Sequence, residues 1–211
     1  MFTGIIKKTA RIKAIEKKGG CLFFDIAKPA GWKIFLGQSL AINGVCSTVK
    51  SVSRNNFKVE YMPETIKRTT AGFLKISDKV NLERSLKLND LVDGHLVQGH
   101  IDVVGEIIGR QSAGDSIILK IKLSTEFMKF IASKGSGAVA GISLTVVDVG
   151  KDWFTVSLVS YTLENTNLDL IKSGDKVNIE TDVIAKYLEK ICNVNNKKIS
   201  PSIGGKLMAA G

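Results

Sequence analysis

Both histidines of the 211-residue chain, His95 and His100, lie five residues apart in the stretch LVDGHLVQGHID, and each follows a glycine. Imidazoles at this spacing could form a catalytic pair, ligate a metal ion or belong to a simple connection. No further histidine, cysteine or acidic residue accompanies them at a spacing typical of zinc sites. The sequence therefore disfavours a metal centre, and the other two interpretations stay open at this point.

Two further stretches carry small polar or reactive side chains. Cys46-Ser47-Thr48 follows a Gly-Val step, and Ser143-Leu144-Thr145 follows a Gly-Ile step. Each could be an ordinary strand segment, or a polar barrel edge that binds the hydroxyls and ring amides of a small ligand. No nucleophile elbow, P-loop or dinucleotide fingerprint is present. Two similar edges predict two similar ligands, held by pocket shape and pre-placed polar groups.

The two edges recur because the chain repeats itself. Residues 78–83, DKVNLE, match residues 175–180, DKVNIE, at five of six positions and an offset of 97. Residues 41–49 align with 138–146 at the same offset, and near the start an offset of 96 places Gly4-Ile5 on His100-Ile101. Several blocks in one order indicate two tandem copies of one domain.

Each copy reads as β structure. FKVEY at 57–61 and FTVSL at 154–158 alternate with period two, as half-buried strands do, and glycine turns separate short strands. We therefore expect two small β-barrels in tandem, each with a short helix, such as residues 124–133 in the second copy. A helix with one apolar face follows from Val183, with Asp182 as its N-cap. With no domain left to cover, this face is expected to pack against another subunit.

Composition narrows the class of protein. A hydrophobic content of 44% and a charged content of 24% are ordinary for a globular protein, and no apolar run is long enough to span a bilayer. The start of the chain lacks the pattern of a signal peptide, so we expect a cytoplasmic protein with three reduced cysteines. The net charge of +10 raises nucleic acid as a partner, but 25 lysines against five arginines favour a solvated lysine-rich surface.

Taken in order, the motifs resemble those of the riboflavin synthase family, alpha-chain type. They are MFTGI at 1–5, NGVCSTV at 43–49, MPET at 62–65, NLER at 81–84, the two Gly-His pairs, KGS at 134–136, GISLTV at 141–146 and TLE at 162–164. The resemblance covers residues 1–195 and includes the duplication. It implies an all-β fold of two tandem six-stranded Greek-key β-barrels and a C-terminal α-helix. The implied domains are residues 1–94 and 95–182, a trimerisation helix at 183–195 and a tail at 196–211.

The family's reaction is a dismutation that needs no cofactor. One molecule of 6,7-dimethyl-8-ribityllumazine gives a four-carbon unit to another, which yields riboflavin and 5-amino-6-(ribitylamino)uracil. The duplication then has a chemical reason, because donor and acceptor are the same compound. The resemblance implies a homotrimer in which a productive pair of ligands forms between neighbouring subunits. It also suggests an association with lumazine synthase, and it implies no nucleic-acid or membrane partner.

By position, the resemblance implies that residues 4–6, 46–48 and 60–65 contact one ligand, and that residues 99–101, 143–145 and 157–162 contact the other. Lys134 is expected to reach in from an adjacent chain, and Phe2 to pack at the site. The residues implied in activation and proton transfer are Cys46, His100, Ser143 and Asp182. The implied substrate-binding set is Phe2, Gly4, Ile5, Ile6, Cys46, Ser47, Thr48, Glu60, Tyr61, Met62, Pro63, Glu64, Thr65, Gly99, His100, Ile101, Lys134, Ser143, Leu144, Thr145, Ser157, Leu158, Val159, Ser160, Tyr161 and Thr162.

This placement separates the two histidines: His100 opens a ligand-binding strand, whereas His95 is expected to be a hinge or supporting residue in the connection. The second copy departs from the family pattern at Ala140, where an aspartate is usual, and at Ser160-Tyr161, where a Pro-His or Pro-Glu pair is common. The first departure keeps an alternative open, a non-catalytic lumazine- or flavin-binding protein of the optical antenna type. A basic barrel that binds nucleic acid is a third interpretation, and it lacks a stacking platform for bases.

Overall fold

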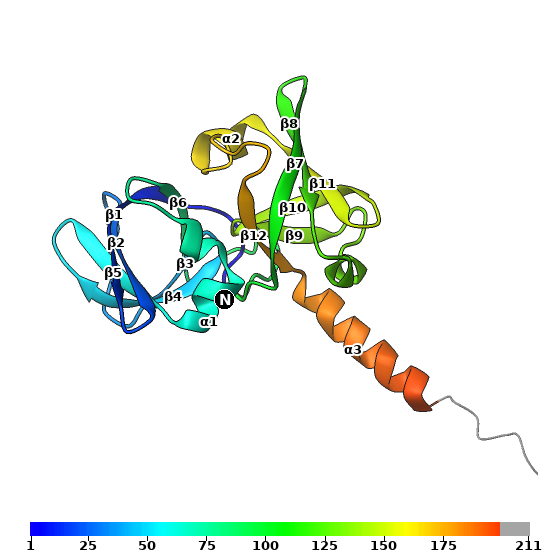
Figure 1. The fold of residues 1–211 in the computed structure, drawn as a ribbon, viewed down its shortest axis with the longest axis horizontal. Helices are drawn as coiled ribbons and strands as arrows, with labels where there is room; N and C mark the ends of the chain where they lie inside the picture. The colour runs from blue at the N-terminus through cyan, green and yellow to red at the C-terminus, as the bar shows by residue number, and fades with distance from the viewer. Residues whose placement is uncertain (199–211) are drawn as a thin grey trace, which may run out of the picture.

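The computed structural model describes residues 1–198, which form two closed six-stranded antiparallel β-barrels and a C-terminal helix (Figure 1). In the first barrel the strands pair in the cyclic order β1-β2-β5-β4-β3-β6. Their bounds are β1 Lys8–Lys18, β2 Cys21–Ala27, β3 Ser39–Ile42, β4 Val45–Val52, β5 Asn56–Tyr61 and β6 Lys79–Arg84. In β4 and β5 buried and more exposed side chains alternate, as the period-two pattern predicts.

The second barrel repeats the first, since its strands follow the equivalent cyclic order β7-β8-β11-β10-β9-β12. Their bounds are β7 Val103–Ala113, β8 Ser116–Lys122, β9 Ser136–Val139, β10 Ile142–Val149, β11 Trp153–Leu158 and β12 Lys176–Thr181. The predicted all-β fold with internal duplication is confirmed.

Short helices follow the same strand in each copy: α1 (Pro63–Arg68) comes after β5, and α2 (Ser160–Asn165) after β11. The first copy adds the 3-10 turn η1 (Thr70–Phe73). In the second copy the helix expected over residues 124–133 is a shorter 3-10 turn, η2 (Thr125–Phe130). It ends where Ile131 takes an extended conformation and enters the barrel core.

The two barrels are joined where the openings of the two copies pair with each other. Phe2 and Val97 form an isolated antiparallel bridge, in which the N–H of Phe2 donates to the Val97 carbonyl at 2.7 Å and the N–H of Val97 returns a bond to the Phe2 carbonyl at 3.1 Å. Both side chains are fully buried, and with Ala41 and Ala138 they make a small separate core. Phe2 therefore joins the two barrels.

The opening segments of the two copies are exchanged at this interface. Ile6, which precedes β1 of the first barrel, packs against the core of the second barrel. Ile101, which precedes β7 of the second barrel, packs against the core of the first. Each barrel is therefore completed by a segment of the other copy.

The helix α3 (Val183–Lys198) projects away from both barrels (Figure 1). Its predicted N-cap is confirmed, because the carboxylate of Asp182 accepts a hydrogen bond from the Ile184 N–H at 2.9 Å. An ion pair of 2.7 Å between Lys186 and Asp102 ties its first turns to the second barrel. Four large side chains remain more than half exposed, namely Ile184, Tyr187, Leu188 and Ile191. Within residues 1–198 the structure contains no helix with the length and apolarity to cross a bilayer. Most of the expected tail, residues 199–211, lies outside the described part.

Candidate functional site

Cys46 lies near the start of β4 with its side chain exposed. Its backbone N–H donates to the carbonyl of Gly99 at 2.8 Å. A Cβ at position 99 would lie 2.6 Å from the Cβ of Cys46, and Gly99 has a φ of +82°, so only glycine fits. The thiol of the first barrel is therefore bordered by the opening segment of the second copy.

Ser143 has the equivalent environment in the second barrel. Its N–H donates to the Gly4 carbonyl at 2.8 Å, and a Cβ at Gly4 would lie 2.7 Å from the Cβ of Ser143. The structure brings Gly4 to Ser143 and Gly99 to Cys46, whereas the expected grouping placed Gly4 with Cys46 and Gly99 with Ser143. The exchange of opening segments is the physical reason, since each segment crosses to the other barrel before its own first strand begins.

At the start of the two copies, the residues that correspond in the structure differ by one position from the alignment expected from the sequence. Glu83 accepts hydrogen bonds from the N–H groups of Thr3 and Gly4, and Glu180 accepts them from Gln98 and Gly99. Gly4 is therefore equivalent to Gly99, an offset of 95 rather than 96. By this correspondence Ile5 in one copy occupies the place of His100 in the other.

His95 is not a simple hinge, because its imidazole Nδ1 lies 2.7 Å from the hydroxyl oxygen of Ser143. Burial of the ring lowers the pKa of His95, and the negative charge of nearby Asp182 opposes this only in part. Its second nitrogen, Nε2, is buried with no partner among the described residues. The site thus holds a neutral imidazole next to a serine, with Asp182 at the head of α3 nearby. The sequence signal was Gly94, where a Cβ would come within 2.8 Å of Ser143.

His100 is exposed immediately after Gly99, on the side of the interface that carries Cys46. The structure thus divides the two histidines between the two barrels: His100 accompanies Cys46, and His95 accompanies Ser143. The prediction that they are not a matched pair is consistent with this arrangement.

Side chains alternate between the surface and the barrel core along the candidate strands. Ser47 and Tyr61 point inward, and their hydroxyl oxygens lie 2.7 Å apart within the first barrel. Burial raises the pKa of Tyr61, so this phenol stays protonated. Leu144 and Leu158 belong to the second core. A ligand on the surface could meet these four residues only through their backbone groups. The exposed members of the candidate set are Cys46, Thr48, Met62, Pro63, Glu64, His100, Lys134, Thr145, Ser157, Val159, Ser160 and Tyr161, whereas Ile5, Ile6, Glu60, Thr65, Ile101, Ser143 and Thr162 are partly buried.

Charged candidates beside the first barrel are paired. Glu60 forms an ion pair with Lys50, and Glu64 in α1 forms one with Arg68, which holds the pKa of the Glu64 carboxyl below its usual value. Both pairs are solvent-accessible and contribute little to folding. Their carboxylates remain available to a polyhydroxyl ligand on the surface.

Two candidate residues, Phe2 and Lys134, are not placed to contact a ligand directly within one chain. Phe2 is fully buried between the barrels, so in this structure it positions Thr3 and Gly4. Lys134 is exposed in the loop before β9, in a left-handed conformation with a φ of +66°. The equivalent residue in the first copy is Gly37, at φ +77°. A lysine here carries backbone strain that its glycine counterpart does not.

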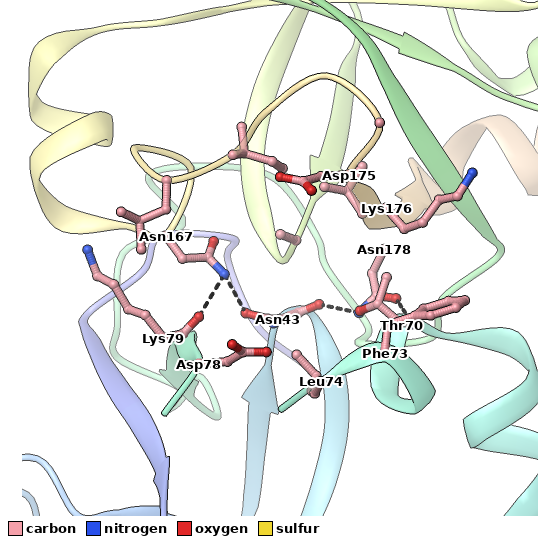
Figure 2. A pocket seen from close by; sticks show the side chains of 15 residues that line it. Asn43, Thr70, Phe73, Leu74, Asp78, Lys79, Asn167, Asp175, Lys176 and Asn178 are labelled. Atoms are coloured by element: carbon pink, nitrogen blue, oxygen red, sulfur yellow. Dashed lines mark hydrogen bonds between the residues drawn. The ribbon is translucent and has the colours of Figure 1, made fainter. Parts of the chain in front are cut away.

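A separate cavity of about 430 Å³ lies between the barrels (Figure 2). None of the candidate substrate residues lines it. Asn43 lines this cavity, and its amide oxygen accepts hydrogen bonds from the Asn81 N–H at 2.8 Å and from the Asn167 amide at 3.1 Å. The residue equivalent to Asn43 is Ala140, which also lines the cavity. The departure at Ala140 therefore affects the contact between barrels, in a cavity that neither Cys46 nor Ser143 lines.

Comparison with known proteins agrees with this duplicated architecture. The family model described as "Lumazine binding domain" matches the chain twice, over residues 3–85 and 98–182. A riboflavin synthase from Actinobacillus pleuropneumoniae is 44% identical over 191 residues, which cover 90% of this chain and 89% of that protein. A riboflavin synthase from Bacillus subtilis is 36% identical over 198 residues, or 93% of this chain and 92% of that protein.

Solved structures share the fold. A crystal structure of LumP complexed with riboflavin superposes with a TM-score of 0.81 at 24% identity, covering 86% of this chain and 99% of that one. Another, of LumP complexed with 6,7-dimethyl-8-(1'-D-ribityl) lumazine, gives a TM-score of 0.79 at the same identity and coverage. At this identity the likeness establishes the two-barrel fold alone.

Proposed function

This chain belongs to the riboflavin synthase family, and we propose that it converts two molecules of 6,7-dimethyl-8-ribityllumazine into riboflavin and 5-amino-6-(ribitylamino)uracil. One molecule gives up a four-carbon unit and the other receives it, without a cofactor. The relative that is 44% identical across 90% of the chain carries this assignment.

The observation in the structure that best supports this reaction is the equivalence of Cys46 and Ser143. Each lies in the same place of its barrel, with its N–H bound to a glycine carbonyl from the other copy. A reaction between two identical molecules needs two similar sites, and the duplicated chain offers both. Holding two rings in a reactive orientation can supply roughly 7 to 11 kcal/mol of the barrier.

We assign one ligand to each surface according to the exchanged segments. The first lies at residues 46–48, 60–65 and 99–101, with Cys46 and His100 beside it. The second lies at residues 143–145, 157–162 and 4–6, with Ser143 and His95 beside it. Backbone groups of the strands read the pyrimidine edge, and the hydroxyls and Glu64 hold the ribityl chain.

The proton transfers are assigned to the polar side chains at these surfaces. The C7-methyl group of the lumazine is acidic because its carbanion is delocalised into the ring, so a modest base suffices. His95 is suited to accept a proton near neutral pH, because burial keeps its imidazole neutral. Its hydrogen bond aligns Ser143, and the charge of Asp182 stabilises the imidazolium once it forms.

We further propose that the protein is a homotrimer assembled through α3. The exposed side chains of Ile184, Leu188 and Ile191 need a partner, and Lys134 would enter a neighbouring subunit's site. Removing residues from Val183 onward should lower the mass measured by sedimentation equilibrium from trimer to monomer. The same number of subunits in the full-length and the truncated protein would reject α3 as the assembly element. A cytoplasmic location and an association with lumazine synthase stay predictions.

The direct test is to incubate the purified protein with 6,7-dimethyl-8-ribityllumazine and follow both products by chromatography. We expect one riboflavin for every two lumazines consumed. A Cys46→Ala, Ser143→Ala double variant is the matched control, because it removes both surface groups and leaves the barrel cores intact. Tight binding of the lumazine without product would reject catalysis and favour the antenna-type alternative.

A further inference from the structure

Two buried glutamates occupy equivalent places near the ends of β6 and β12. Glu83 is 3% exposed and Glu180 is 2% exposed. Charged side chains are rarely buried so completely unless they are paired or fully hydrogen-bonded. Neither residue forms an ion pair with any residue of 1–198, so their role must lie in the groups that they bind.

Each carboxylate accepts hydrogen bonds from two consecutive backbone N–H groups. One oxygen of Glu83 accepts from the N–H of Thr3 at 2.7 Å and from its hydroxyl at 2.8 Å, and the other accepts from the N–H of Gly4 at 3.0 Å. Glu180 accepts from the N–H of Gln98 at 2.7 Å and from that of Gly99 at 2.8 Å. The two opening segments are therefore held in place by the end strand of their own barrel.

The next hydrogen bond in each chain of contacts crosses to the other barrel. The carbonyl of Gly4, whose N–H is bound by Glu83, accepts from the N–H of Ser143. The carbonyl of Gly99, whose N–H is bound by Glu180, accepts from the N–H of Cys46. A Cβ at Gly4 would lie 2.7 Å from the Cβ of Ser143, and one at Gly99 would lie 2.6 Å from the Cβ of Cys46, so no space separates each glycine from the residue that it faces.

We infer that Glu180 is the positioning residue for the Cys46 surface of the first barrel, and that Glu83 is the positioning residue for the Ser143 surface of the second. Each glutamate thus acts on the copy to which it does not belong. The two ligand surfaces within one chain are linked through the pair of exchanged segments. The importance for turnover rests on the proposed function, whereas the crossed effect on Cys46 does not.

Glutamine is a suitable probe at both positions. Burial raises the pKa of both carboxyls, which means that the fold bears a desolvation cost for each negative charge. Glutamine has the same shape and no charge, but it presents only one acceptor oxygen to two N–H donors. The variants should fold, but one of the two backbone N–H groups should lose its hydrogen bond.

The thiol of Cys46 reports on the crossing. In a Cys192→Ser background only Cys46 remains exposed among the three cysteines, because Cys21 is buried. The rate of its reaction with a neutral maleimide should change severalfold in the Glu180→Gln variant and stay within experimental error in Glu83→Gln. Glu106→Gln, an exposed carboxylate on β7 outside these hydrogen bonds, is the matched control and should leave the rate unchanged.

The ligand gives an independent readout of the same crossing. Riboflavin fluorescence titration should show one weakened site per chain in each variant, and adding Cys46→Ala should weaken binding further in Glu83→Gln than in Glu180→Gln. Should a glutamine variant fail to fold, Glu180→Asp and Glu83→Asp shorten the side chain and replace that variant in both assays. Equal thiol rates in all variants, or a change caused by Glu83→Gln alone, would overturn the inference. A crossed thiol effect in a protein that forms no riboflavin would instead retain the inference and reject the proposed function.

Discussion

The imidazole Nδ1 of His95 and the hydroxyl oxygen of Ser143 lie 2.7 Å apart, although the two residues come from the connection between the barrels and from the middle of the second copy. Both groups are partly buried, and the second imidazole nitrogen has no partner among the described residues. A buried imidazole with one free nitrogen next to a serine hydroxyl has the arrangement of a proton acceptor.

Replacing His95 with asparagine should lower kcat on the order of a hundredfold, the usual effect of losing a positioned acid–base group. Because burial lowers the pKa of His95, the neutral form persists below pH 6.5. The acid limb of the kcat profile of the unchanged protein should therefore lie below pH 6.5, and it should disappear in the variant. Stopped-flow measurement of riboflavin formation between pH 5 and 8 gives both profiles. An acid limb that the variant retains would assign it to another group.

The same shift in the pKa of His95 predicts a stability effect. The unfolded imidazole takes up a proton near pH 6.5, whereas the folded one does so at lower pH. This contribution to stability is fully present above pH 6.5 and is lost as the pH falls through the folded pKa. Urea unfolding at pH 8, 7, 6 and 5 should show a smaller loss of stability for His95→Asn than for the unchanged protein. The difference isolates His95, since Glu83, Glu180 and His100 are common to both proteins. A constant difference across this range would contradict the prediction.

Lys134 offers a test in which stability and activity should move in opposite directions. Glycine at this position relieves a left-handed conformation, so Lys134→Gly should raise the free energy of unfolding by about 1 kcal/mol. If the ammonium group meets a ligand in a neighbouring subunit, kcat/KM should fall on the order of tenfold or more. Lys134→Gln is the control, since it removes the charge and keeps the strain; it should lose activity with no gain in stability. Unchanged turnover in both variants would remove Lys134 from the site.

The duplicated barrels could be predicted from the sequence because the signals for their strands and turns lie close together along the chain. Alternating strands such as β5, glycine turns and the N-cap at Asp182 each act within a few residues, and the repeat supplied every signal twice. The length of the helix expected over residues 124–133 was overestimated, because Ile131 packs into the barrel core in an extended conformation.

The exchange of opening segments could not be predicted in the same way. Whether Gly4 faces Cys46 or Ser143 depends on contacts between residues that are far apart in the sequence, and the two glycine segments resemble each other. The register of the copies is fixed by Glu83 and Glu180, which act over 79 to 82 residues of sequence. The contact between His95 and Ser143 was missed for the same reason. These relationships carry the candidate site, and they are properties of the packed molecule.

The broken symmetry at Ala140 predicts that the second copy can be stabilised from the first. Asn43 and Ala140 both adopt left-handed conformations, with φ values of +46° and +49°, which asparagine tolerates better than alanine. The Asn43 amide oxygen accepts from the Asn81 N–H, whereas Ala140 offers no acceptor to the equivalent N–H of Asn178. Ala140→Asn should therefore raise the free energy of unfolding by about 1 kcal/mol.

The reverse change, Asn43→Ala, is the matched control for this prediction. It leaves the Asn81 N–H and one donor of Asn167 without their acceptor, so it should cost about 1 to 3 kcal/mol. Urea denaturation of the three proteins measures both effects. Because position 140 lines the cavity between the barrels and Ser143 does not, riboflavin formation by the folded Ala140→Asn protein should equal that of the unchanged chain. A large gain in turnover with no gain in stability would mean that the missing side chain acts on the ligand rather than on the contact between barrels.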